Sequence, residues 1–142
     1  MTRTTKMFFL FVLFSFISIK GFSQLSISYY SSSLSKIGMG YDFNDKLRSE
    51  LRLYSNISIY NLIPELVVCY NIVKKERYNV YLGLGANFNY ETYYGGFVFP
   101  AGVQFTPIEN FDRFSLHIEL QPTYGIVDDL IIQSSWGLRY KF

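Results

Sequence analysis

Apolar and polar residues alternate with a period of two over much of the chain. In residues 78–88 the side chains of one parity are Tyr78, Val80, Leu82, Leu84, Ala86 and Phe88. The same alternation returns in residues 97–106 and 114–121. Because successive side chains of a strand point to opposite faces, these three segments predict strands with one apolar and one polar face.

Five further segments fit the same pattern, so the sequence predicts about eight strands. They are residues 25–30, 37–43, 47–54, roughly 62–72, where the alternation is less regular, and 131–142. The last segment has Ile132, Trp136, Leu138, Tyr140 and Phe142 on one parity. We expect this strand to pair with the first and close a barrel.

Two kinds of connection alternate between the predicted strands. Short polar turns are expected at residues 44–45, 74–76 and 107–112, and the other connections at 31–35, 55–61, 91–96 and 123–129. In an up-and-down barrel whose termini face the periplasm, the first set is periplasmic and the second extracellular.

Glycines and charged residues indicate which face lies inside. Glycine weakens a solvated strand but fits a narrow barrel interior, where large and small side chains share the space. The polar parity contains Gly38, Gly40, Gly83, Gly85, Gly102 and Gly137. We therefore expect this parity to face the lumen and the apolar parity to face lipid, the reverse of a soluble barrel.

A lumenal polar network is predicted on the same parity. Its expected members are Arg48, Glu50, Arg52, Glu65, His117, Glu119, Arg139 and Lys141. Arg139 and Lys141 should pair with carboxylates such as Glu50, Glu65 or Glu119, because an unpaired buried charge is costly. Eight strands enclose a space that side chains fill, so we expect no open pore. On the final strand, Trp136, Leu138, Tyr140 and Phe142 should face lipid.

The N-terminus predicts export. Arg3 and Lys6 precede an apolar run at residues 7–19, and Gly21 and Ser23 are small residues before Gln24. This is the order of a secretory signal, and the run is shorter than a spanning helix. We therefore expect residues 1–23 to be a signal peptide for the Sec pathway and residues 24–142 to be the barrel domain.

Charge and cysteine content exclude several function classes. The chain has 13 basic and 11 acidic residues, and the predicted signal peptide contains three of the basic ones. The rest is nearly balanced, so no nucleic-acid partner is expected. Cys69, the only cysteine, cannot form an internal disulfide. Together with the single histidine it supplies too few ligands for a zinc site, and we expect no cofactor.

Ser115, His117 and Glu119 form the one arrangement that resembles a catalytic site. At alternate positions of a strand they share a face, but successive members lie about 6–7 Å apart. A serine nucleophile and its base need a direct hydrogen bond. We therefore interpret the three as lumenal polar residues and expect no enzyme activity.

Several stretches resemble a known protein class. Residues 100–125, PAGVQFTPIENFDRFSLHIELQPTYG, and the terminal WGLRYKF are similar to the small outer-membrane β-barrel proteins of Bacteroidetes-type bacteria, which share the architecture of the eight-stranded OmpX and OmpA barrels. The resemblance implies location in the outer membrane and insertion by the barrel-assembly machinery through the C-terminal strand. It implies no catalytic activity.

Three functions therefore stay open from the sequence. The first is a monomeric outer-membrane barrel with a structural or surface-interaction role and outer-membrane lipid around it. The second is a secreted or periplasmic lipocalin-like carrier of an apolar ligand. The third is a lipid A-modifying barrel hydrolase.

Overall fold

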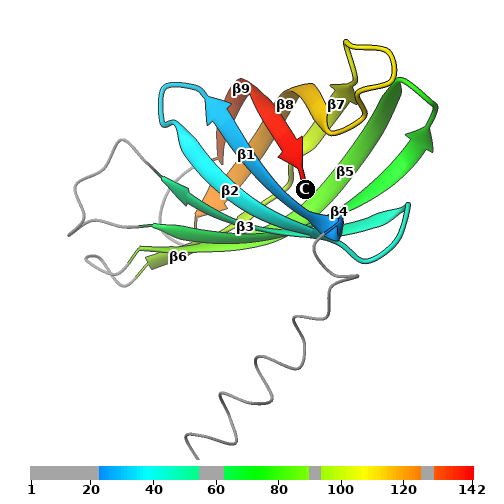
Figure 1. The fold of residues 1–142 in the computed structure, drawn as a ribbon. Helices are drawn as coiled ribbons and strands as arrows, with labels where there is room; N and C mark the ends of the chain where they lie inside the picture. Colours follow the sequence, from blue (N-terminus) through cyan, green and yellow to red (C-terminus); the bar gives the residue numbers. More distant parts are fainter. Residues whose placement is uncertain (1–22, 55–62, 90–93, 126–129) are drawn as a thin grey trace, which may run out of the picture.

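The computed structural model describes residues 23–54, 63–89, 94–125 and 130–142, and these form one antiparallel β-barrel (Figure 1). The strands are β1 (Leu25–Ser31), β2 (Lys36–Asp42), β3 (Leu47–Tyr54), β4 (Pro64–Lys74), β5 (Tyr78–Asn89), β6 (Tyr94–Val98), β7 (Ala101–Phe105), β8 (Phe114–Gly125) and β9 (Leu130–Lys141). Most of the predicted signal peptide lies outside the described residues.

The barrel is closed with eight strand positions. Apart from β6 and β7, strands that are consecutive in sequence pair with each other, and β9 returns to pair with β1 through pairs such as Tyr29↔Leu138. The strands β6 and β7 share one position between β5 and β8, so they are one interrupted strand. The interruption falls at Pro100, which has no N–H to donate. The predicted barrel of about eight antiparallel strands is confirmed.

Backbone hydrogen bonds continue across this interruption. The Gly83 amide donates to the Pro100 carbonyl (2.7 Å), and the Phe99 amide donates to the Pro122 carbonyl (2.9 Å). The registers on both sides of Pro100 are the same, so the proline does not shift the strand faces.

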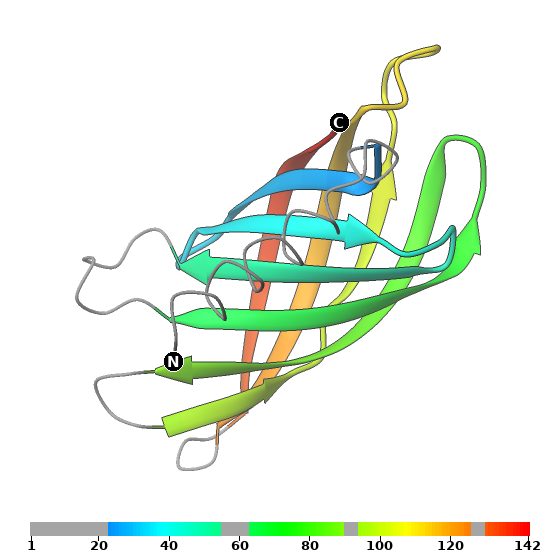
Figure 2. The same cartoon turned by 60° about the horizontal axis from the view of Figure 1, so that its bottom comes forward.

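The strands are staggered around the barrel, as closure requires. Successive pairs that start at Ser26 lead round the sheet through Gly40, Glu50 and Val67 to Ile131 on β9. Ser26 itself pairs on β9 with Lys141 at the opposite end of the strand. A staggered barrel has strands that are inclined to its axis, and Figure 2 shows this inclination.

The barrel has a polar inside and an apolar outside. Large apolar side chains such as Met39, Leu84 and Ile118 are about 57–61% exposed, although they lie in the middle of long strands. Arg52 on β3, Glu65 on β4 and Glu119 on β8 are, by contrast, fully buried. The two faces therefore lie opposite to those of a soluble barrel.

One part of the interior is apolar. Val67, Cys69, Tyr81 and Val98 pack together on the side formed by β4, β5 and β6. Val67 and Cys69 stand at inward positions where other strands have polar residues, which explains the irregular pattern of residues 62–72. A bulge between Asn71 and Val73 adds to the irregularity.

Two of the connections predicted from the sequence include residues that belong to strands in the structure. The expected connection at 91–96 contains the start of β6, because Gly96 pairs with both Asn87 and Gly125. The expected connection at 123–129 likewise contains the end of β8. Gly95, Gly96 and Thr123 form ladders with adjacent strands. The connection at 55–61 lies outside the described residues.

Candidate functional site: the barrel interior

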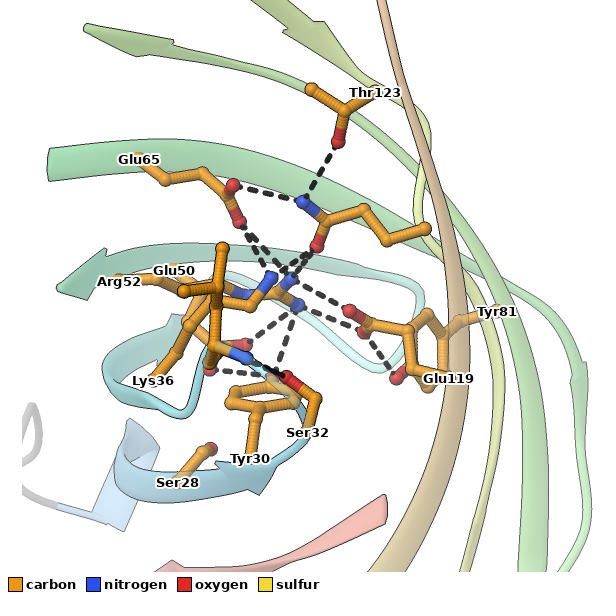
Figure 3. A network of polar contacts seen from close by, with 12 residues as sticks. Ser28, Tyr30, Ser32, Lys36, Glu50, Arg52, Glu65, Tyr81, Glu119 and Thr123 are labelled. Atoms are coloured by element: carbon orange, nitrogen blue, oxygen red, sulfur yellow. Dashed lines mark hydrogen bonds and ion pairs between the residues drawn. The ribbon is translucent and has the colours of Figure 1, made fainter. Parts of the chain in front are cut away.

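Arg52 lies at the centre of the buried polar side chains. Its two terminal nitrogens donate to the two carboxylate oxygens of Glu119 across the lumen, at 2.8 and 2.9 Å. Figure 3 shows this contact between β3 and β8. A bidentate guanidinium–carboxylate pair is the strongest geometry for such a bond. It therefore links opposite walls of the barrel.

Arg139 and Glu50 form a second pair beside the first. Arg139 Nη2 donates to Glu50 Oε2 at 3.0 Å, and Nε donates to Ser28 Oγ at 2.8 Å. The Tyr30 hydroxyl accepts from Arg52 and Arg139, both at 2.9 Å, and donates to Glu50 at 2.7 Å. Tyr30 thus connects the two ion pairs into one network.

Lys36 and Glu65 form the third part of the network. Lys36 Nζ donates to Gln121 Oε1 at 2.5 Å and lies 3.4 Å from Glu65 Oε1. Glu65 also accepts from Tyr54 at 3.1 Å and from Gln121 Nε2 at 2.9 Å. We call the connected side chains the central network: Tyr30, Lys36, Glu50, Arg52, Glu65, Glu119, Gln121 and Arg139.

Inward-facing glycines provide space for these large side chains. A Cβ at Gly102 would lie 2.5 Å from the Tyr81 hydroxyl, which donates to Glu119 at 2.6 Å. A Cβ at Gly137 would lie 2.7 Å from His117 Nε2. The predicted sharing of a narrow interior by glycines and bulky residues is therefore observed at these positions.

Ser115, His117 and Glu119 all face inward but do not form a catalytic triad. Ser115 Oγ accepts from Gln104 Nε2 at 2.9 Å, and Glu119 is bound by Arg52 and Tyr81. Within the described part of the chain, neither ring nitrogen of His117 has a hydrogen-bond partner. The imidazole instead packs on the Tyr30 ring, with centroids 4.3 Å apart. The acid therefore does not orient the histidine.

A polar cavity of about 560 Å³ opens at the turn end of the barrel, which we define by the β2–β3, β4–β5 and β7–β8 turns and the C-terminus. The deeper lining residues of this cavity include Arg48, Gln104, Ser115 and Arg139. Of these, Arg48, Ser115 and Arg139 are buried. Arg48 Nη1 donates to Gln104 Oε1 at 3.2 Å, and Arg139 also donates to Gln104.

Lys141 does not join the central network. It is the last residue of β9, and its ammonium pairs with Asp42 at 2.9 Å at the rim of the cavity. The expected contact with Glu50, Glu65 or Glu119 is therefore wrong for Lys141, because these carboxylates lie deeper. A second rim pair joins Lys74 and Asp45, and this hydrogen bond holds the pKa of Asp45 below its ordinary value.

The other predicted lumenal residues lie in the interior. Arg48, Glu50, Arg52, Glu65, His117, Glu119 and Arg139 are all buried. On the final strand, Trp136, Leu138, Tyr140 and Phe142 are on the exposed face. Sequence reasoning did not include Tyr30, Lys36 and Gln121, although each shares the parity of an inward-facing glycine, serine or glutamate.

Among the described residues, no cluster of histidine, cysteine and acidic side chains could hold a metal ion. The same residues include no helix of the length and hydropathy needed to cross a membrane. Comparison with known proteins gave no match to a protein-family model, to a curated protein or to a solved structure.

Proposed function

We propose that the protein is a small outer-membrane β-barrel with a structural or surface-interaction role and without an open pore. The observation that carries the proposal is the reversed arrangement of the faces. Ion pairs fill the inside, and apolar side chains cover the outside. A barrel in water would gain nothing from exposing this surface, whereas a barrel in lipid buries it.

The aromatic residues support this proposal. Outward-facing aromatic side chains gather near the turn end at the ends of several strands: Phe43, Tyr70, Tyr78, Phe105, Tyr140 and Phe142. Pairs such as Leu47↔Tyr70 and Tyr78↔Phe105 bring them near the strand ends. Membrane barrels have aromatic girdles at the interface, with aliphatic residues between them. Met39, Leu51 and Leu66 have such intermediate positions on β2, β3 and β4.

The central network supports the absence of a pore. Arg52, Glu65 and Glu119 meet across the lumen, and their side chains are fully buried. Solute passage would require these ion pairs to separate, which leaves charges uncompensated.

The two alternative functions find less support. A carrier of an apolar ligand needs an apolar cavity, whereas the cavity at the turn end is lined mainly by polar and charged residues. A hydrolase needs a base bonded to its nucleophile, whereas Ser115 is bonded to Gln104. The closed barrel with eight strand positions also fits the resemblance to small Bacteroidetes-type barrels.

Cell fractionation combined with a gel-shift assay tests the proposal. We expect the protein in the detergent-extracted outer membrane, with different gel migration before and after heating because the folded barrel resists unheated detergent. Recovery of a folded monomer from the periplasm without detergent would contradict the proposal. A lipid A profile unchanged by overexpression would separately argue against the hydrolase.

The C-terminal strand should be required for insertion by the barrel-assembly machinery. The Phe142 amide donates to the Leu25 carbonyl at 3.0 Å, so the last residues contribute to the β1–β9 seam. Deletion of residues 140–142 should strongly reduce the folded protein in the outer membrane. Deletion of residues 108–110 in the β7–β8 turn is the matched control, because it removes three residues outside the strands. Equal outer-membrane yields would contradict this role.

A further inference from the structure

We propose that the cavity at the turn end is a binding site for the oxyanion group of a small solute, either a carboxylate or a phosphate. Its floor contains Arg48, Ser26 and Ser115, and the cavity volume of about 560 Å³ accommodates a small organic acid. This inference uses the interior of the barrel and does not depend on its location in a membrane.

The first observation is the charge of the interior. Among the described residues, the buried cations are Lys36, Arg48, Arg52 and Arg139, and the buried carboxylates are Glu50, Glu65 and Glu119. One positive charge is therefore unmatched, and His117 could only add to it. A buried charge without a counter-charge is costly, so the interior favours an added anion.

The unmatched cation is Arg48. Glu119 and Glu65 lie within 3.4 Å of Arg52, and Glu50 lies 3.0 Å from Arg139. Arg48 Nε, by contrast, is 3.8 Å from Glu50, which is too long for a hydrogen bond. The Arg48 guanidinium also lies over the Tyr81 ring, 5.1 Å from its centroid, in a cation–π contact.

The second observation is a group of buried donors without partners. Arg48 Nε, Arg48 Nη2 and Ser26 Oγ make no hydrogen bond to the described part of the protein. Both residues are at least 95% buried, and both line the cavity. They lie on either side of Gly40, where a Cβ would come 2.7 Å from Ser26 Oγ and 3.7 Å from Arg48 Cδ. A guanidinium and a hydroxyl together match the acceptors of an oxyanion.

The charged residues at the rim of the cavity do not compensate the positive charge at its floor. Asp42, Asp45, Glu76 and Asp112 line the outer part of the cavity together with Lys74, Lys75, Arg113 and Lys141. The charges at the rim therefore balance, and Asp42 and Asp45 already pair with lysines. A polar cavity with a balanced rim and a cationic floor attracts an anion to the floor.

A titration followed by NMR tests the site. Isotope-labelled protein isolated from the cell, in detergent micelles if it requires them, is titrated separately with acetate and inorganic phosphate. Sodium chloride keeps the ionic strength constant. We expect the NMR chemical shifts of Ser26, Arg48, Gln104 and Ser115 to change and to saturate with at least one of the two anions. The anion that produces saturation shows whether the site prefers a carboxylate or a phosphate. Shifts that do not saturate with either anion would overturn the proposal.

Two substitutions test the residues. Arg48→Gln should weaken binding by at least about tenfold, because it removes charge-assisted bonds. Lys75→Gln, which removes an exposed rim charge, is the matched control and should change the affinity by less than about threefold, as surface charges do. Equal affinities of wild type and Arg48→Gln would overturn the assignment.

Ser26→Ala provides a second route if Arg48→Gln does not fold. Loss of this neutral hydroxyl should weaken binding by about threefold to tenfold without changing the charge of the interior. An unchanged affinity in Ser26→Ala would overturn the proposed site, because Ser26 supplies one of its unpartnered donors.

Discussion

Leu51 and Arg52 are consecutive residues of β3 in opposite environments. Leu51 is 48% exposed on the outer surface, whereas Arg52 is fully buried and bonded to Glu119, Gln121 and Tyr30. The backbone is the same for both, so the difference comes only from the alternation of a strand. The comparison shows that the hydrophobic pattern specifies two surfaces, while the glycines and the paired charges on one of them decide which surface is inside.

The inner surface depends on specific partners and the outer surface does not. Removal of one member of a buried ion pair leaves an uncompensated charge. Replacement of one outward aliphatic residue by another changes only the fit to the surroundings. The following substitutions test this difference, beginning with the largest expected effect.

Arg52→Met should lower the free energy of unfolding by about 3–5 kcal/mol, because Glu119 and Glu65 lose their shared cation in a buried site. Urea unfolding of the protein in lipid vesicles measures the loss. The neighbouring Leu51→Met is the control and should cost less than about 1.5 kcal/mol. Adding Glu119→Gln to Arg52→Met should recover part of the stability, because it removes one uncompensated charge. Equal effects of Arg52→Met and Leu51→Met would contradict the comparison.

Leu51→Arg should lower the stability of the barrel in lipid vesicles by about 2–4 kcal/mol, the cost of a charge near the middle of a bilayer. Phe43→Arg, beyond the end of β2, should cost about 0–1 kcal/mol, because residues near the interface reach water. The same urea titration gives both values. If the outer surface faced water, Leu51→Arg would remain within about 0.5 kcal/mol of the wild type.

The sequence predicted the barrel and the orientation of its faces because alternation and glycine placement are local signals. Arg48, Glu50 and Arg52 share the parity of the inward-facing glycines, and this placed them in the interior. The faces of the irregular segment at 62–72 were harder to predict, because Val67 and Cys69 face an apolar part of the interior. Alternation cannot distinguish an apolar residue inside from one outside.

The sequence indicated that Arg139 would meet a carboxylate such as Glu50, Glu65 or Glu119, and it pairs with Glu50, but the sequence could not distinguish among the three. The partners depend on the stagger of the strands, which sets how far along the barrel each side chain lies. Arg139 reaches Glu50, whereas Lys141, two residues later, pairs with Asp42 at the rim. The unmatched charge of Arg48 also needed the complete set of buried ion pairs, including Lys36 at the opposite end of the lumen.

Gly102→Ala should cost about 1–3 kcal/mol, the usual range for overpacking. The added methyl group would meet the Tyr81 hydroxyl, and movement of Tyr81 would weaken its hydrogen bond to Glu119. Gly95→Ala is the milder comparison and should cost less, because a Cβ at Gly95 would lie 3.1 Å from the Asn87 carbonyl oxygen, a tight contact that a small shift relieves. Similar unfolding midpoints for the two variants would show that the interior is less tightly filled than the contacts indicate.

Lys141→Gln should have the smallest effect, less than about 1 kcal/mol, because its ion pair with Asp42 lies at the rim and both side chains are partly exposed. Arg139→Gln, two residues earlier on the same strand, should cost about 3–5 kcal/mol, since it leaves Glu50 with only the more distant Arg48 and Arg52. Urea unfolding at low and at high salt distinguishes the effects of these two substitutions on the free energy of unfolding. Salt should remove most of the small Lys141 effect and little of the Arg139 effect, because water and ions screen only the exposed pair. A loss for Lys141→Gln as large as that for Arg139→Gln would mean that the buried interior extends to the end of β9.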